Sequence, residues 1–200
     1  MFKRMAGAVA MTLLAACGAE NRTGLPETET TGTVQSAQDT STASATTTGV
    51  TGGTVSAMAP QEKEFVANAG MGGLFEVRAG NLMVEKATNP NVKSFAQRMV
   101  ADHSMANAEL AHLATLKGLA LPTELAGTHQ AAFQHLSSLS GAELDQAYMQ
   151  HMVEDHTKDV AEFQKTSTSA TDADLRGWAT KTLPTLREHL ALARDLAGQV

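Results

Sequence analysis

The chain has 200 residues, a formal net charge of −6 at pH 7 and a single cysteine. An acidic chain without a cluster of basic residues is unsuited to nucleic acid or to an anionic lipid surface, because both attract positive charge. A single cysteine also excludes a disulfide within the chain.

The first 16 residues have the pattern of a bacterial export signal. Lys3 and Arg4 provide a basic start, and a short apolar stretch runs from there to Ala16. This stretch is too short to span a bilayer, which takes about 20 residues in a helix, so we leave it out of the fold. Leu14-Ala-Ala-Cys17 resembles the lipobox of bacterial lipoproteins, in which the cysteine is lipidated and becomes the new N-terminus. An ordinary signal peptide with a chance cysteine is the alternative.

We therefore expect a lipoprotein that is held to a membrane through lipid on Cys17. Several acyl chains, at about 0.8 kcal/mol per buried methylene, anchor a protein durably. Loss of residues 1–16 removes two positive charges and changes the formal net charge from −6 to about −8. Gly18, rather than Asp, follows the cysteine. By resemblance to lipoprotein sorting in Gram-negative bacteria, this implies the outer membrane, with the protein facing the periplasm.

Residues 17–59 form the predicted tether. They are rich in Thr, Ser, Gly, Gln and Ala, contain no aromatic residue and have no apolar periodicity. Such a composition cannot bury enough surface to offset the entropy of ordering, so we expect disorder. A flexible coil of some 40 residues has a root-mean-square reach of about 35 Å, which would hold the following domain away from the membrane.

Residues 60–200 form the predicted folded domain, and their composition shifts to Ala, Leu, Met, Val and charged residues. Apolar residues recur at helical spacing in four segments. These segments are about Gln61–Thr88, Pro90–Lys117, Gly141–Thr166 and Ala173–Ala197. A short helix near His129–Leu139 is expected within the long connection between the second and third segments, which can cross the whole bundle. The sequence thus predicts an all-α, ferritin-like four-helix bundle with a long crossover.

Several residues mark the expected helix ends. Asn89 before a proline is a typical N-cap, and Ser140-Gly-Ala-Glu143 has the spacing of a capping box, which Thr171–Asp174 resembles. Gly118 is expected to end the second helix. Pro184 should kink or interrupt the last one. The glycine cluster 70–73 is expected to permit close helix packing.

The second and third long helices contain an internal repeat. Phe95-Ala-Gln-Arg-Met-Val-Ala-Asp-His103 aligns without gaps on Tyr148-Met-Gln-His-Met-Val-Glu-Asp-His156. With a crossover that traverses the bundle, these helices run parallel, and His103 and His156 come within about 3 Å of one level. Glu76 should lie opposite His103, and His189 on the last helix matches this level less well.

Buried histidines and a carboxylate cost several kcal/mol unless they pair or bind a cation. One hypothesis is a transition-metal site for iron, zinc, copper or manganese, with Glu76, His103, His156 and His189 as ligands. Asp102, Asp155 and Glu188 would then hold the histidine tautomers from outside. The other hypothesis is a self-satisfied network that specifies helix pairing and binds no metal.

Other chemistry has weaker support. Glu109-Leu-Ala-His112 has the Glu-x-x-His spacing of di-iron sites, but a second copy is missing. The ten methionines are better explained as core-filling residues than as copper ligands. No phosphate loop or nucleophile elbow occurs. His112, His129, His135 and His151 fall off the helical stripes and are expected to face solvent.

The domain resembles the bacterial domain-of-unknown-function family four-one-four-two, which is classed as ferritin-like and labelled outer membrane protein. The matching segments are Gly72-Gly-Leu-Phe-Glu76, Phe95–His103, Ser140-Gly-Ala-Glu143, Met152–His156 and Thr182-Leu-Pro-Thr-Leu-Arg-Glu-His189. The resemblance implies a four-helix bundle and an exported, membrane-associated protein. It supplies no activity, and a shared fold does not carry function.

The sequence favours a binding or structural protein over an enzyme. The primary interpretation is a non-catalytic structural or partner-binding role in the envelope, including a role under stress. The alternative is the binding or storage of a transition metal in the bundle core. The protein partner and the oligomeric state are left open.

Overall fold

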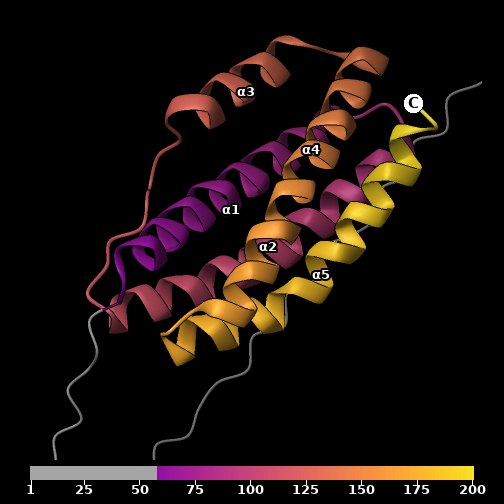
Figure 1. The fold of residues 1–200 in the computed structure, drawn as a ribbon. Coiled ribbons are helices and arrows are strands. Elements are labelled where there is room, and N and C mark those ends of the chain that lie inside the picture. Colours follow the sequence, from indigo (N-terminus) through magenta and orange to yellow (C-terminus); the bar gives the residue numbers. More distant parts are fainter. Residues whose placement is uncertain (1–57) are drawn as a thin grey trace, which may run out of the picture. The chain divides into compact units, whose positions relative to one another are not determined.

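The computed structural model describes residues 58–200, and that part of the chain contains five helices and no strand. The export signal, Cys17 and nearly all of the tether lie outside the described residues. The helices are α1 (Pro60–Lys86), α2 (Pro90–Leu116), α3 (Gly127–Ser138), α4 (Gly141–Ser169) and α5 (Ala173–Ala197), as Figure 1 shows. None of the five is long and apolar enough to cross a bilayer.

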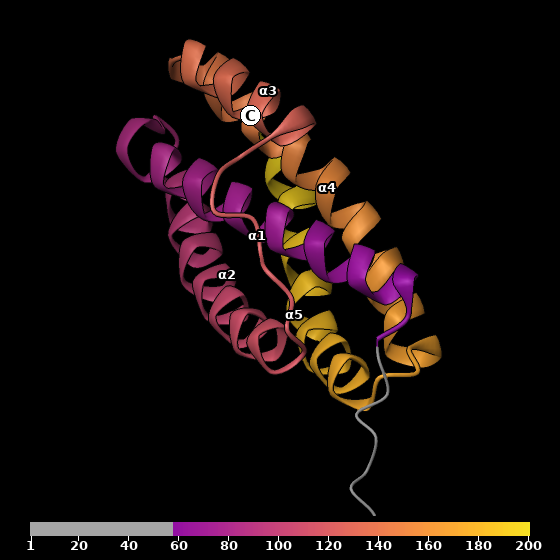
Figure 2. The same ribbon diagram turned by 90° about the vertical axis from the view of Figure 1, so that its left-hand side faces the viewer.

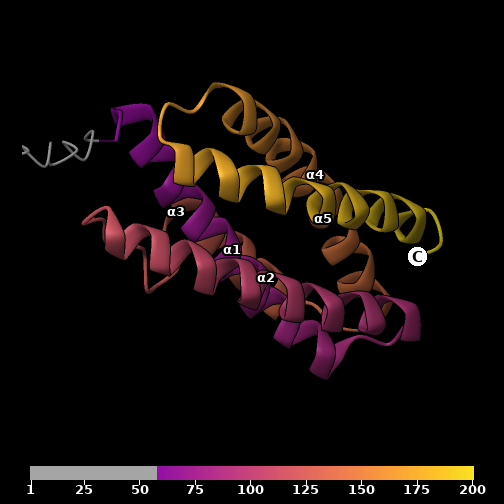
Figure 3. The same ribbon diagram turned by 90° about the horizontal axis from the view of Figure 1, so that it is seen from below.

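The four long helices pack as two hairpins, α1 with α2 and α4 with α5. Figure 3 shows the α4–α5 hairpin on one side of the bundle and the α1–α2 hairpin on the other. The connection after α2 runs across α1 before α3 begins (Figure 2). Because this crossover traverses the bundle, α2 and α4 run in the same direction (Figure 1). The predicted all-α bundle, with its crossover and short extra helix, is confirmed.

Two of the expected helix ends are confirmed and two are wrong. The Asn89 side chain accepts from the first backbone N–H groups of α2, and Gly118 ends α2 with a φ of 67°. Ser140 makes no capping hydrogen bond with the described residues, because Gly141 enters α4 with a φ of 62° and displaces the first turn. α5 is capped by the Asp172 side chain, one residue later than the expected box.

Pro184 does not interrupt α5, which continues from Ala173 to Ala197. Its ring is exposed, whereas Leu183 and Leu186 on either side are buried in the core. Packing of the buried face therefore outweighs the loss of one backbone hydrogen bond on the solvent side.

The glycine cluster of α1 contains positions with opposite surroundings. A Cβ at Gly73 would lie 1.9 Å from Oδ1 of Asn107 on α2, so this glycine allows the close approach that the sequence predicts. Gly80, seven residues further along α1, also allows a close approach, because an added Cβ would lie 2.7 Å from Cγ2 of Val100 on α2. At Gly72, by contrast, no described atom other than its chain neighbours and the backbone of its own helix would lie within 4 Å of an added Cβ.

The apolar core is divided into two clusters. One contains Phe75, Met83, Phe95, Met99, Leu144, Tyr148 and Met152 and lies toward the α1–α2 turn. The other contains Val66, Leu110, Phe163, Leu175, Trp178 and Leu186 and lies toward the α4–α5 turn. On all four long helices, the stretch between the two clusters carries a buried ionisable residue.

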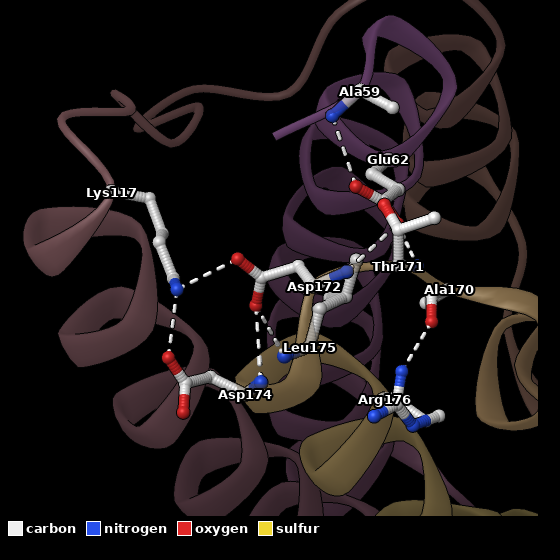
Figure 4. A network of polar contacts seen from close by, with 9 residues as sticks. All are labelled: Ala59, Glu62, Lys117, Ala170, Thr171, Asp172, Asp174, Leu175 and Arg176. Carbon is white, nitrogen blue, oxygen red and sulfur yellow. Dashed lines mark hydrogen bonds and ion pairs between the residues drawn. The ribbon is translucent and has the colours of Figure 1, made fainter. Parts of the chain in front are cut away.

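Each end of the bundle is closed by a buried carboxylate. At one end, Glu62 in the first turn of α1 accepts hydrogen bonds from the backbone N–H and hydroxyl of Thr171 and from the N–H of Asp172, in the turn between α4 and α5 (Figure 4). It also accepts from the N–H of Ala59 at 2.9 Å. At the other end, Asp145 near the start of α4 accepts from Thr88 and Asn89 in the α1–α2 turn. Each hairpin therefore inserts a carboxylate into the turn of the other.

The Glu62 contact makes a pH-dependent contribution to stability. Burial raises its pKa, but the hydrogen bonds from Ala59, Asp172 and Thr171 outweigh burial and lower it. A lowered pKa stabilises the fold above the pKa of the unfolded chain, and this stability is lost as pH falls through the folded pKa. We expect Glu62→Gln to reduce the free energy of unfolding at pH 7 by roughly 1.5–3 kcal/mol.

Urea unfolding at pH 7 and at pH 3.5 measures this effect. The free energies of unfolding of Glu62→Gln and of the parent chain should differ less at pH 3.5 than at pH 7. The exposed residue Glu64, two positions along the same helix, provides the control substitution Glu64→Gln. A constant difference between Glu62→Gln and the parent at both pH values would contradict the account.

Candidate metal centre

Four buried ionisable side chains, one from each long helix, meet between the two apolar clusters. They are Glu76 from α1, His103 from α2, His156 from α4 and His189 from α5, and none is more than 6% exposed. The three imidazole centroids lie 5.6, 5.3 and 5.4 Å apart. The structure thus brings together the four residues that the sequence proposes as ligands, including His189, which the residue count along its helix matches to this level less well.

The helix pattern explains this convergence. His103 and His156 occupy equivalent places in the repeat, and their parallel helices carry them into the core at the same height. Each lies four residues after a buried methionine of the same stripe, Met99 and Met152. The histidines therefore continue the faces that pack the bundle.

Hydrogen bonds fix the tautomers of two imidazoles. Nδ1 of His156 lies 3.0 Å from the carbonyl oxygen of Met152. A carbonyl only accepts, so Nδ1–H is the donor and Nε2 keeps its lone pair. Nε2 of His189 lies 2.8 Å from Oδ2 of Asp102. Burial raises the Asp102 pKa, but the bonds from His189 and Arg98 outweigh it and lower that pKa. The ionised Asp102 therefore accepts from Nε2–H, and Nδ1 of His189 keeps its lone pair.

Glu76 holds the third imidazole. Its Oε2 lies 2.6 Å from Nδ1 of His103, and its Oε1 lies 3.4 Å from Nε2 of His156. Burial raises the pKa of Glu76 to about 7, and the nearby His156 opposes that rise. When Glu76 is ionised it accepts from Nδ1–H of His103, which leaves the lone pair on Nε2.

The three imidazoles are neutral at neutral pH. Burial lowers the pKa of His103 and of His189 to about 4. Burial also lowers the pKa of His156, against the attraction of Glu76. Neutral imidazole is the form that binds a metal ion.

The centre of the cluster is not self-satisfied. Nε2 of His103, Nε2 of His156, Nδ1 of His189 and Oε1 of Glu76 are buried and have no hydrogen-bond partner among residues 58–200. One ring nitrogen from each histidine lies within 4.8 Å of the others. A metal ion about 2.1 Å from each nitrogen would set such atoms about 3.4–3.6 Å apart. Oε1 of Glu76 and Nε2 of His156 already have this separation, at 3.4 Å.

The residues expected to act from outside the centre have different roles. Asp102 reaches His189 across the α2–α5 interface and is itself held by Arg98, whose Nε lies 3.3 Å from Oδ2. Glu188 is exposed and pairs with Arg98, and no hydrogen bond or ion pair between described residues joins it to the three histidines. Asp155 is directed along its own helix to His151, at 3.5 Å, because it lies one residue, about 100°, around α4 from His156.

The structure also identifies two residues that the sequence argument did not assign to the site. The hydroxyl of Tyr148 is buried without a partner in the described chain, and burial together with the charge of Glu76 raises its pKa. Asp159 lines a cavity of about 20 Å³ that Glu76 and His103 also line. Both are departures from the repeat, which has Phe95 in the place of Tyr148 and Ala106 in that of Asp159. Comparing the two copies for added polar atoms would have found them.

The remaining histidines lie outside the centre. His112 and His135 are exposed, as predicted, and Glu109 pairs with Lys181 at 2.5 Å rather than with His112. His129 and His151 are only partly exposed, and both rings lie against Phe75, with centroids 5.6 and 4.7 Å away. The expectation that these two face solvent holds only in part: both line a groove between α1, α3 and α4, while each ring also packs against Phe75.

Comparison with known proteins identifies the family of the domain and solved structures that share its fold. The family model of a domain of unknown function, DUF4142, matches residues 48–196. A DUF305 fragment from Deinococcus radiodurans superposes with a TM-score of 0.63 at 16% identity, covering 72% of this chain and 99% of the fragment. A DUF305 protein from Streptomyces coelicolor has a TM-score of 0.58 at 14% identity, covering 69% and 93%. At these identities the likeness establishes the shared fold alone. No curated protein matches the chain.

The lowered histidine pKa values predict a loss of stability on mild acidification. His103 and His189 have folded pKa values of about 4 against an ordinary 6.5. The folded chain then binds fewer protons than the unfolded chain between these values, so stability present above pH 6.5 is lost as pH falls toward 4. The raised pKa of Glu76 has the opposite effect on the pH dependence of stability. It offsets only part of the effect, because three imidazoles have lowered pKa values.

We expect His189→Gln, in a chelating buffer, to flatten the dependence of unfolding free energy on pH between 6.5 and 4.5. The reduction in slope should reach up to about 1.4 kcal/mol per pH unit, the value for one proton. Exposed His135→Gln should leave the slope unchanged. Equal slopes for His189→Gln and the parent chain would show that burial does not suppress the charge on His189.

Proposed function

This chain belongs to the DUF4142 family, whose description names no activity, and we propose that its function is to bind one transition-metal ion within the bundle core. The ligands are Nε2 of His103, Nε2 of His156 and Nδ1 of His189, with Oε1 of Glu76 beside them. This is a binding function and includes no reaction step.

The observation that carries the proposal is that three buried histidines from three helices offer ring nitrogens within 4.8 Å of one another. One nitrogen of each imidazole, and Oε1 of Glu76 beside His156, lack a hydrogen-bond partner in the described chain. Each unsatisfied buried polar atom costs about 1–3 kcal/mol. Three of the four belong to imidazoles whose other nitrogen is fixed by a hydrogen bond, which leaves the lone pair on the unpartnered nitrogen. This division of the two nitrogens is the usual arrangement of metal-binding histidines.

The charge and the donor types support the same function. A divalent ion among three neutral imidazoles would keep its full charge in an apolar core, and the Glu76 carboxylate reduces it. Asp102 adds a second negative charge behind His189 and shares Arg98 with Glu188. Imidazole and carboxylate donors suit zinc, iron, copper and manganese.

A metal-free structural role is the second candidate. It is favoured by the bonds from Glu76 to His103 and from Asp102 to His189, because these join neighbouring helices. In this account the network specifies how the helices pair, and any partner binds elsewhere on the domain. The two candidates differ in whether stability responds to metal.

We expect the full chain, stripped with a chelator, to take up one equivalent of Zn²⁺ or Co²⁺. Binding should raise the free energy of unfolding, by about 2.7 kcal/mol when free metal is 100 times the dissociation constant. His103→Ala, His156→Ala and His189→Ala should each abolish this rise, whereas the exposed-site control His112→Ala should keep it. Elemental analysis and thermal unfolding with and without Zn²⁺ measure both quantities.

Retention of no metal by the parent chain, together with an unchanged melting temperature, would reject the metal centre without reference to any variant. The structural role predicts instead that His103→Ala loses roughly 1–3 kcal/mol through its orphaned partner. That loss should be the same with and without a chelator.

We propose further that lipid on Cys17 holds this domain at the cell envelope. The proposal depends on the Leu14-Ala-Ala-Cys17 segment, which lies outside the described residues. When expressed in a bacterium with lipoprotein processing, the chain should partition with membranes, and Cys17→Ser should move it to the aqueous fraction. Equal partitioning of the two proteins would leave no role for the cysteine.

A further inference from the structure

A groove of about 600 Å³ lies between the first half of α1, the start of α3 and the second half of α4. Acidic and imidazole side chains line it from all three helices, including Glu64, His129, His151, Asp155 and Glu162. Lys158 and Lys165 also contribute to the wall, so the groove carries both signs of charge.

The groove adjoins the small cavity beside the metal centre. That cavity, of about 20 Å³, is lined by Glu76 and His103, and it shares Gly72, Asp159 and two apolar residues with the groove. The apolar pair is Ala69 and Phe163, so Asp159 is the one ionisable side chain that faces both spaces.

We propose that this groove is the entrance through which a divalent cation reaches the core, with Gly72 as the opening and Asp159 as the carboxylate that receives the ion there. The proposal rests on the metal-binding function. The ion would pass from Asp159 to Oε1 of Glu76 and then to the three histidines.

The surroundings of Gly72 support an opening at this point. The space beside Gly73 is occupied by Asn107 of α2. By contrast, apart from its chain neighbours and the backbone of its own helix, no described atom lies within 4 Å of the place where a Cβ of Gly72 would be. A glycine in a helix interior costs roughly 0.5–1 kcal/mol relative to alanine. At Gly73 close packing explains that cost. At Gly72 no packing contact explains the cost, and this residue lines both the groove and the cavity.

The position of Asp159 supports its role. It is half-buried on α4, three residues after His156 and on the side that faces α1. Burial and the charges of Glu76 and Asp155 raise its pKa well above the ordinary value. A cation that binds at Asp159 displaces the proton from this carboxyl and offsets the negative charges of Glu76 and Asp155 around it.

The rate of metal uptake tests the entrance separately from the affinity. The full chain is stripped and mixed rapidly with Co²⁺, and the visible spectrum of the bound ion is followed. Gly72→Leu should slow uptake and release while the final stoichiometry stays at one. Gly177→Leu is the matched control, because Gly177 is an exposed helical glycine on α5 with no described atom within 4 Å of an added Cβ.

Asp159→Asn provides a second variant that adds no bulk. It should slow uptake by on the order of tenfold at low salt, with a smaller effect at high salt. Glu154→Gln, an exposed substitution on α4 that does not line the groove, should leave the rate unchanged.

The outcomes separate the two proposals. A parent chain that binds no Co²⁺ rejects the metal centre and the entrance together. A parent chain that binds Co²⁺, while Gly72→Leu and Asp159→Asn fill as fast as their controls, rejects the entrance and leaves the centre intact. Slow filling by Asp159→Asn supports the entrance even if Gly72→Leu fails to fold.

Discussion

The structure depends on how one layer of polar side chains is satisfied in the middle of an apolar bundle. Three imidazoles and a carboxylate separate the two hydrophobic clusters, and every long helix supplies one of them. Each imidazole is held through one nitrogen, by Met152, Asp102 or Glu76. Those bonds fix the direction of the other ring nitrogen. At the centre of the layer, the second nitrogen of each imidazole and Oε1 of Glu76 have no hydrogen-bond partner in the described chain.

The rest of the bundle keeps this layer in register. Gly73 and Gly80 let α1 and α2 approach closely, which brings Glu76 against His103. The buried carboxylates Glu62 and Asp145 join each hairpin to the turn of the other, so the hairpins cannot slide past one another without breaking hydrogen bonds at both ends. A ligand set spread over four helices needs such constraints, because a shift of one helix by a residue would remove one ligand.

Sequence periodicity predicted the helices and much of the centre. The helical stripes carried Glu76, His103, His156 and His189 inward, and the ungapped repeat matched the heights of two of the histidines. The sequence could not predict which histidine each of the two aspartates, Asp102 and Asp155, would contact. Asp102 and Asp155 occupy equivalent places in the repeat, yet one crosses to His189 and the other stays on its own helix with His151.

The local errors have physical causes as well. Pro184 has the strongest helix-breaking propensity of any residue, but tertiary packing on both sides of it decides the outcome. Serine is a favourable N-cap residue, but the positive φ of Gly141 prevents the Ser140 side chain from reaching the first N–H groups of α4. Helical periodicity alone does not select Asp159. Its departure from Ala106 in the other copy of the repeat marks it, and the cavity that it lines places it beside the centre.

The Glu62 contact has a mechanical consequence. The chain enters the domain at Met58, which is itself buried, and Glu62 lies in the first helical turn beyond it. A pull on the chain at this point loads three hydrogen bonds to Thr171 and Asp172 at once, because one carboxylate accepts all three (Figure 4). Lys117 ties the same turn to the end of α2 through Asp172 and Asp174. Tension is therefore distributed over α1, α2 and the α4–α5 turn, and the domain resists unravelling from the end at which a tether would hold it.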